Sequence, residues 1–331
     1  MKKILFATTA LVATTGMAAA EVTFGGFGRF GLYYEENDTG DNETRIEQRF
    51  RLTATGVATS DNGLKFEGRI RWQTDDQSGL PDATDAGSGG IGASNIARRS
   101  AAGFAVTSGG FRLDVGSVSD VLDSGDVVNF YGYGVGLTSF VEQSSGWGDQ
   151  IPANGFSVKD DDSLVDPTVK LRYTAGDLTV SASYTDGAPV EDAGTIVEDE
   201  EWQLGIGYNF GNYSAGIGFG NSTTDTDDVK TADNDFWAAS FGGDIGAFAF
   251  SILVGASDLQ DDTSYGFSVK YDVSAATDIR FAFSDNGVDA DDEAYGIGFR
   301  HSLGGGVSLR GGIGQNTGGN TVADLGVIFN F

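Results

Sequence analysis

The feature that most constrains this chain is an alternation of apolar with polar or small residues, at a period of two, in one short segment after another. In the segment 202–210, Trp, Leu, Ile, Tyr and Phe alternate with Gln, Gly, Gly and Asn. The same alternation occurs at 178–185, 265–272 and 323–331. A period of two predicts β-strands that have one apolar face and one polar face.

Counting such segments predicts sixteen strands and an all-β chain. An even number of antiparallel strands is typical of a closed bacterial transmembrane barrel. The predicted strands span residues 22–33, 44–57, 64–73, 98–108, 111–117, 166–175, 177–186, 201–210, 213–221, 235–243, 246–256, 264–273, 278–285, 293–303, 306–315 and 321–331.

The connections between these segments alternate in length. Short turns such as 60–63, 109–110 and 304–305 alternate with longer, mostly acidic connections. The longer connections are 34–43, 74–97, 118–165, 187–200, 222–234, 257–263 and 286–292. Short periplasmic turns and long external loops are the pattern of an outer-membrane barrel. A soluble β-sandwich would bury both inner faces, whereas the second face here carries the Gly, Ser, Thr, Lys, Arg and Asp that suit a wet lumen.

The two ends of the chain indicate export to the outer membrane. Lys2 and Lys3 precede a short apolar stretch and the small residues 18–20, as in a secretory signal peptide. The stretch is too short for a membrane-spanning anchor, which needs about 20 apolar residues. We therefore expect residues 1–20 to be a signal peptide and residues 21–331 to form one barrel domain.

The formal net charge is −28 at pH 7, which argues against nucleic acid as a partner. The acids gather in Gly-, Asn- and Asp-rich stretches, which are typical of solvated loops. No cofactor is expected, although structural Ca²⁺ at these acidic loops is conceivable. A merely hydrated acidic surface explains any one loop equally well.

The connection 118–165 is far longer than its neighbours, and a loop of this length is usually functional. It carries both carboxylates and bulky apolar groups that would be unfavourable in water. Folding the loop into the barrel would cover these groups and narrow the lumen. The apolar and aromatic residues are Val127, Val128, Phe130, Tyr131, Tyr133, Phe140 and Trp147, and the carboxylates include Asp120, Asp123 and Asp126.

The basic residues complement this loop. Nine Lys and Arg residues lie between positions 29 and 99. By strand parity, five arginines of the first three strands share the inward face, where they form one patch at mid-height. They are Arg29, Arg49, Arg51, Arg69 and Arg71. Grouped like charges need compensation, so we expect Asp120, Asp123 and Asp126 to face them across a constriction. The alternative is ordinary solvation of the lumen without a constriction.

Several stretches in order give the chain a resemblance to the trimeric general porins of alphaproteobacteria, of the Rhodobacter type. They are Glu21-Val22, Asp166 to Val169 with Tyr173 to Gly176, Tyr208-Asn-Phe-Gly-Asn-Tyr213, Leu303-Gly-Gly-Gly306, and Val322 to Gly326 running to Phe331. The resemblance covers most of the chain after residue 20.

The resemblance implies sixteen strands, a third loop folded inward as an eyelet, and a homotrimer joined through the first and last strands. It places Arg29, Arg49 and Arg71 at basic positions of the pore wall, whereas Arg51 and Arg69 are added by parity alone. It also implies outer-membrane lipid and lipopolysaccharide on the outside of the barrel. Inside, ions and small hydrophilic solutes would diffuse passively through a water-filled channel.

Three other functions compete with this interpretation. A barrel enzyme would need a nucleophile or general base, but the single histidine, His301, shares parity with outward-facing Tyr295 and Ile297. A structural barrel or adhesin has few strands and a lumen filled with side chains. A substrate-selective channel would carry an aromatic track or concentrated cations, and the arginine patch leaves that alternative open.

Overall fold

The computed structural model describes residues 21–36, 43–77, 97–156, 167–187, 189–192, 195–227 and 229–331. The expected signal peptide, residues 1–20, lies outside the described residues, as does the acidic run 160–162 of the long loop. In the described part of the chain, no helix is long and apolar enough to cross a membrane.

Eighteen strand segments form a single antiparallel sheet. They are β1 (Glu21–Glu35), β2 (Glu43–Thr59), β3 (Lys65–Gln77), β4 (Arg98–Arg99), β5 (Gly103–Ser108), β6 (Phe111–Gly116), β7 (Thr168–Ala175), β8 (Leu178–Asp186), β9 (Val190–Asp192), β10 (Thr195–Phe210), β11 (Tyr213–Thr226), β12 (Val229–Ile245), β13 (Phe248–Ser257), β14 (Ser264–Asp272), β15 (Thr277–Asp285), β16 (Ala294–Gly304), β17 (Val307–Gln315) and β18 (Thr321–Asn330). Because β4 and β5 both pair with β3, and β8 and β9 both pair with β10, the wall has sixteen strands, as the sequence predicts.

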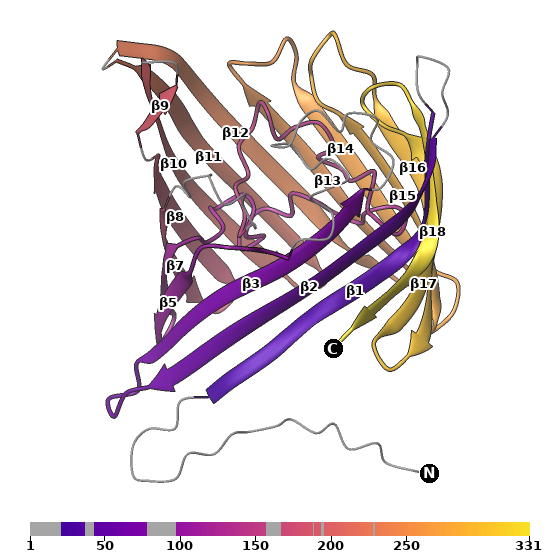
Figure 1. Ribbon diagram of the computed structural model, residues 1–331, viewed down its shortest axis with the longest axis horizontal. Coiled ribbons are helices and arrows are strands. Elements are labelled where there is room, and N and C mark those ends of the chain that lie inside the picture. Colours follow the sequence, from indigo (N-terminus) through magenta and orange to yellow (C-terminus); the bar gives the residue numbers. More distant parts are fainter. Residues whose placement is uncertain are drawn as a thin grey trace.

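The sheet closes on itself through its first and last strands. Antiparallel pairing of β1 with β18 runs from Phe27 opposite Asn330 to Glu35 opposite Val322. Gly26 and Phe331 then exchange two backbone hydrogen bonds, of 3.0 and 3.1 Å. Figure 1 shows the resulting barrel of strongly tilted strands, in which the C-terminus and the start of β1 lie at the same end.

The two faces of the wall have the reverse of the burial found in a soluble protein. Along β10 the apolar residues Trp202, Leu204 and Ile206 are exposed, whereas Gln203 and Gly205 between them are buried. The same alternation holds along β8, β14 and β18. The predicted outward apolar face is therefore confirmed, since lipid rather than water surrounds the outside of the barrel.

Parts of two connections predicted as acidic loops, 187–200 and 222–234, are strand instead. Within them, residues 195–200, 222–226 and 229–234 extend β10, β11 and β12, whose pairing continues to Thr226 opposite Val229. These residues are mostly polar on both faces, so the apolar alternation that marks a membrane-embedded strand is absent. Backbone hydrogen bonds nevertheless continue between these strands beyond the membrane. The strands β10 to β12 reach the upper end of the barrel (Figure 1).

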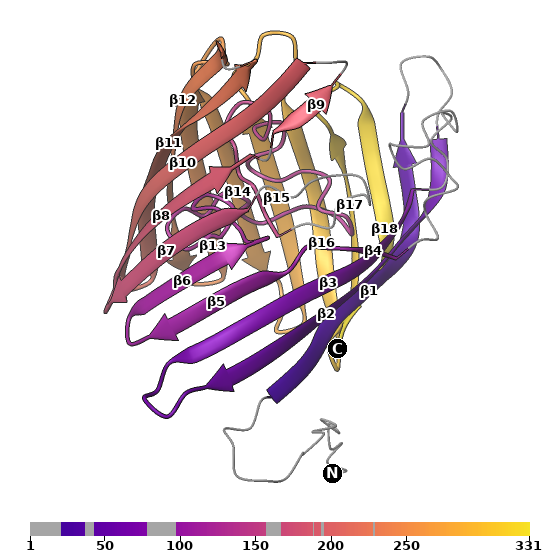
Figure 2. The same ribbon diagram turned by 60° about the vertical axis from the view of Figure 1, so that its left-hand side comes forward.

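The long connection between β6 and β7, hereafter loop 3, runs inside the barrel (Figures 1 and 2), as predicted. It can lie against the wall because the wall presents glycines there. A Cβ at Gly216 or Gly207 would overlap the backbone of Val127, and one at Gly266 would overlap the backbone of Gln143. The high glycine content of the inward face is therefore explained by close approach of a second chain segment.

Loop 3 and the wall share a small hydrophobic core inside the barrel. Trp147, Phe130 and Leu122 of loop 3 pack with Phe236 and Leu253 of the wall, and all five are at most 3 % exposed. A second cluster joins Val135, Val141 and Phe140 to Ala282 and Ala294. The lumen face is thus apolar where loop 3 covers it, which the expectation of a uniformly wet lumen did not include.

We predict that Gly216→Ala destabilises the barrel by about 1–3 kcal/mol, as overpacking of a filled site does. The new methyl group would overlap the Val127 carbonyl and push loop 3 away from β11. Gly25→Ala is the matched control, because a Cβ there meets only the Phe331 carbonyl oxygen, at 3.7 Å. Thermal unfolding in detergent, followed by gel mobility, compares the two variants. Equal midpoints for both would contradict the proposed close contact.

Candidate functional site

Loop 3 is fixed to the wall by a series of lumen-facing serines. Ser240 and Ser251 of β12 and β13 accept hydrogen bonds from the backbone N–H and side-chain amide of Asn129, at 2.8 and 3.0 Å. Ser268 of β14 accepts one from the backbone N–H of Tyr133 at 3.0 Å, and Ser284 of β15 accepts one from the indole N–H of Trp147 at 3.0 Å. Each bond satisfies a loop group that has lost water, so the loop is held in one position.

The carboxylate of Asp324 on β18 holds the middle of loop 3. It accepts hydrogen bonds from the backbone N–H groups of Leu137 and Thr138 and from the Thr138 hydroxyl, each at 2.8 Å. Charge-assisted bonds of this kind are stronger than those between neutral groups. Loop 3 therefore crosses the lumen from β6 to β18 and is fastened at both sides.

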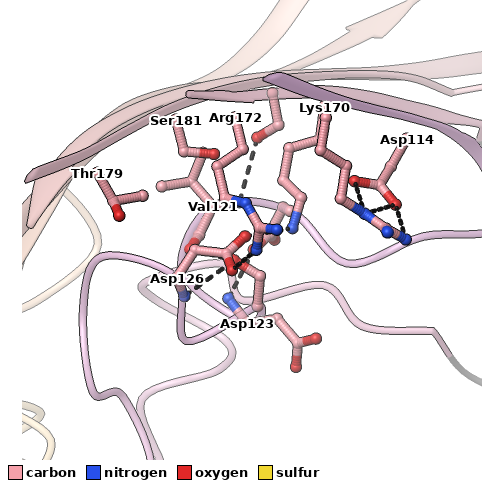
Figure 3. A network of polar contacts seen from close by, with 12 residues as sticks. Asp114, Val121, Asp123, Asp126, Lys170, Arg172, Thr179 and Ser181 are labelled. Carbon is pink, nitrogen blue, oxygen red and sulfur yellow. Dashed lines mark hydrogen bonds and ion pairs between the residues drawn. The ribbon is translucent and has the colours of Figure 1, made fainter. Parts of the chain in front are cut away.

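Asp126 is fixed by cations of the neighbouring wall and not by the arginine patch. Its carboxylate pairs with Lys170 of β7 at 3.1 Å and also with Arg172, and Figure 3 shows both side chains reaching from the wall toward the loop. Burial by itself would raise the pKa of Asp126, but the two cations together lower it below its usual range. Asp126 remains ionised and acts as an anchor for loop 3.

Asp120 was expected to face the arginine patch across the lumen, and this expectation is wrong. The side chain is fully buried and accepts hydrogen bonds from the backbone N–H groups of Asp123, at 2.7 Å, and of Asn154. Burial, together with the neighbouring charge of Glu201, raises the pKa of Asp120 well above its usual range. The carboxyl organises the two ends of loop 3, a role that a loop without regular structure does not reveal in its sequence.

Asp123 is the carboxylate of the expected three that lies beside the arginine patch. It accepts a hydrogen bond from the Tyr131 hydroxyl at 2.6 Å, and its charge acts on both Arg69 and Arg71. Burial and then the charge of Asp123 raise the pKa of Tyr131, so this phenol stays protonated. The side chain of Asp123 is half-exposed.

Arg69 and Arg71 of β3 contact the end of loop 3 directly. Both guanidinium groups lie over the ring of Phe156, at 4.3 and 4.4 Å from its centroid. Arg71 also donates a hydrogen bond to the Phe156 carbonyl oxygen. Stacking on an aromatic ring is favourable for a guanidinium group and keeps both arginines extended toward the lumen.

The other three predicted arginines lie on β1 and β2. Arg29 pairs with Glu47, with 2.6 Å between the Arg Nη2 and Glu Oε1 atoms, and the register sets Arg29 opposite Arg49. Arg51 donates a hydrogen bond to the Gln73 side chain and lies over the ring of Phe27, 5.0 Å from its centroid. Three strands therefore bring the five arginines to one part of the wall.

Sequence reasoning missed a second group of lumen cations on the last strands. Arg280, Arg300 and Arg310 lie on β15, β16 and β17, with Arg300 directly opposite Arg310. The alternation along each strand could have indicated these arginines, since each lies next to outward apolar residues such as Phe299 and Leu309. They escaped notice because they are scattered singly in the sequence and gather only in the sheet.

Other candidate groups have structural roles. His301 accepts or donates a hydrogen bond at 2.8 Å with the Thr277 hydroxyl, and it shares the face of the exposed Tyr295 and Ile297. Among the residues that the structure describes, no three His, Asp or Glu side chains are grouped to hold a metal ion.

The buried carboxyl of Glu142 in loop 3 makes the stability of the folded chain depend on pH. Burial raises the pKa of Glu142 from 4.5 to about 7, against a hydrogen bond from Ser139. The folded chain therefore binds more protons than the unfolded chain between these two values, so stability is greatest below this range and falls as the pH rises through it.

We expect Glu142→Gln to reduce the difference between the unfolding midpoints measured at about pH 5 and about pH 8, because the amide cannot ionise. Asp149→Asn, at an exposed carboxylate of the same loop, is the control and should keep the difference. An unchanged difference in Glu142→Gln would contradict the assignment.

Comparison with known proteins agrees with this arrangement. The family profile described as Gram-negative porin matches residues 7–321. The porin of Fuscovulum blasticum is 28% identical over 316 residues, which cover 94% of this chain and 100% of that protein, and the porin of Rhodobacter capsulatus is 27% identical over 341 residues with the same coverage. A solved triple mutant of Rhodopseudomonas blastica porin superposes with a TM-score of 0.72 at 24% identity, covering 94% of this chain and all of that one.

These matches extend over nearly the whole chain, and the solved structure has a similar fold along its full length. Enzymatic function is therefore excluded, and the outer membrane is the location. The chain belongs to the Gram-negative porin family and forms a general diffusion channel across the outer membrane.

Proposed function

We propose that the channel is narrowest between Asp123 of loop 3 and the arginine patch formed by Arg29, Arg49, Arg51, Arg69 and Arg71. The observation that carries this proposal is the place of Asp123, whose charge acts on Arg69 and Arg71 while loop 3 crosses the lumen beside them. Opposite charges across a narrow, water-filled gap produce a transverse field. Polar solutes align their dipoles with such a field, whereas apolar solutes lose ordered water when they pass.

Asp120 and Asp126, which the sequence also placed in this constriction, contribute in a different way. Asp120 is buried within loop 3, and Asp126 is neutralised by Lys170 and Arg172. We therefore assign them to holding loop 3 and keep only Asp123 as a pore-lining carboxylate. The resulting gap carries more positive than negative charge, which favours passage of anions at low salt.

Replacing Arg49 and Arg71 together by Ser should shift the reversal potential in a salt gradient toward cation preference. Asp123→Asn should shift it toward anion preference. Both shifts should shrink in concentrated salt, because the Debye length falls to about 3 Å at 1 M. Planar-bilayer recordings measure all three effects.

Asp120→Asn is the matched control for Asp123→Asn, because it changes the same functional group within the same loop. We expect channels of this variant that assemble to keep the wild-type reversal potential. Wild-type reversal potentials for both Asp123→Asn and the double arginine variant would exclude these residues from the constriction and leave the channel itself in place.

We also propose that the mature chain begins near Glu21, where β1 begins, and that three copies associate. The outward side chains of β1 support association, since Phe24, Phe30 and Leu32 are 55–65 % exposed. The neighbouring wall is low, because β5 and β6 have six residues each. Six residues span about 20 Å along the strand, which is less than the apolar band of about 25 Å. A neighbouring barrel would cover the part of the apolar band that the short strands β5 and β6 do not span.

A mass measurement of the purified protein in mild detergent should give three times the mass of the chain from Glu21 to Phe331. Phe24→Asp should lower the temperature at which the assembly separates, because it places a charge in the proposed contact between barrels. Tyr265→Asp, at an exposed outward residue of β14 away from β1, is the control. A monomer in every mild detergent would contradict the proposal.

A further inference from the structure

In the described part of the lumen, two arginines face each other across neighbouring strands without an ion pair to a carboxylate. Arg300 of β16 lies directly opposite Arg310 of β17. Toward the described residues, the side chain of Arg300 makes no hydrogen bond or ion pair, and the side chain of Arg310 donates only to the Ser308 hydroxyl, at 3.2 Å. Both side chains are half-buried and therefore reach the solvent of the lumen.

A second cross-strand pair in the same barrel shows how unusual this is. Arg112 of β6 lies opposite Arg172 of β7 in the same arrangement. Arg112 is paired with Asp114 and Glu67, at 3.0 and 2.9 Å, and Arg172 is paired with Asp126. Each of these arginines is thus neutralised by the protein, whereas Arg300 and Arg310 are not.

The charges around Arg300 and Arg310 do not supply the missing anion. The charged groups that act on Arg310 are Arg300, Arg280, Asp278 and Arg29. Asp278 lies opposite Arg300 in the register of β15 and β16, but its carboxylate binds Arg280, at 2.7 Å, and Arg29 is bound to Glu47. The patch of Arg280, Arg300, Arg310 and Asp278 therefore has two uncompensated positive charges.

The patch lies on the periplasmic side of loop 3. A Cβ at Gly298 or Gly312 would lie 2.8–3.2 Å from atoms of Val135 and Gly136, so both glycines face loop 3. Arg300 and Arg310 come two residues nearer than these glycines to the short turn at Gly304–Gly306, and alternate residues share one face. The Arg280 guanidinium also reaches the Gly134 carbonyl oxygen of loop 3, at 3.5 Å. A solute that has passed the constriction meets this patch next.

We propose that Arg300 and Arg310, with Arg280 beside them, form a weak binding site for a small dianion of the phosphate class. A guanidinium group offers a planar pair of N–H donors that matches two phosphate oxygens, and two such groups on adjacent strands can bind one ion from both sides. The charge of hydrogen phosphate equals the excess of the patch. The site is open to water, so binding is weak and reversible, as conduction requires. This inference rests on the proposed function, since it needs an open lumen.

The test is the effect of inorganic phosphate on chloride current through the complete protein in planar bilayers. At low, constant ionic strength, phosphate should reduce the wild-type chloride current in a saturable way. In R300Q/R310Q the half-blocking concentration should rise by about tenfold or more, because both charge-assisted contacts are lost. If the double variant does not assemble, Arg310→Gln alone allows the same comparison.

Arg112→Gln is the matched control, as it removes one arginine of the cross-strand pair Arg112–Arg172, and it should keep the wild-type half-blocking concentration. Phosphate block that is equal in all variants, or lost equally in R112Q and R300Q/R310Q, would overturn the site. Wild-type channels that conduct KCl but show no phosphate block would also overturn it and leave the diffusion channel intact. Absence of KCl conductance from folded protein would instead contradict the channel.

Discussion

The structure depends on one constraint: lipid offers no hydrogen-bond partner, so every backbone amide of the wall must be paired within the protein. The pairing of β1 with β18 meets this constraint where the first and last strands of the described sheet would otherwise leave two open edges. Once the sheet is closed, side-chain chemistry is free to follow the strand period, with apolar groups outside and polar or small groups inside. Sixteen strands also fix a lumen too wide to be filled by side chains alone.

Loop 3 turns this wide lumen into a narrower one, and the inner wall is built to receive it. Glycines such as Gly216 and Gly266 leave space for the loop backbone, and serines such as Ser240 and Ser268 accept its hydrogen bonds. The contacts come from seven or more separate strands, so no single strand determines the position of the loop. The result is a rigid obstruction, since displacing the loop would leave buried N–H groups unsatisfied and expose Trp147.

Much of this fold could be predicted from the sequence because membrane strands encode their environment residue by residue. The faces of β8, β10, β14 and β18, the closure of the barrel and the inward course of loop 3 all follow from parity, connection length and the apolar content of one loop. The extensions of β10 to β12 beyond the membrane could not be predicted, since a strand in water on both faces has no apolar alternation. The roles of the loop carboxylates were equally hidden. Asp120, Asp123 and Asp126 lie within seven residues of one another, yet one is buried, one faces the lumen and one is paired with the wall.

The same reasoning explains where charge can act on a solute. Several lumen cations have a nearby carboxylate, as Arg29 has Glu47 and Arg172 has Asp126, so each of these ion pairs exerts little field at a distance. At physiological salt the Debye length is about 8 Å, and unpaired charges on a wide wall are screened from the channel axis. Charges therefore influence permeation only where loop 3 brings the two walls within that distance, or where the protein leaves a cation unpaired. We propose that Arg69 and Arg71, beside loop 3, meet the first condition and that Arg300 and Arg310 meet the second. On this proposal, selectivity depends less on the net charge of −28 than on which lumen cations lack a carboxylate of their own.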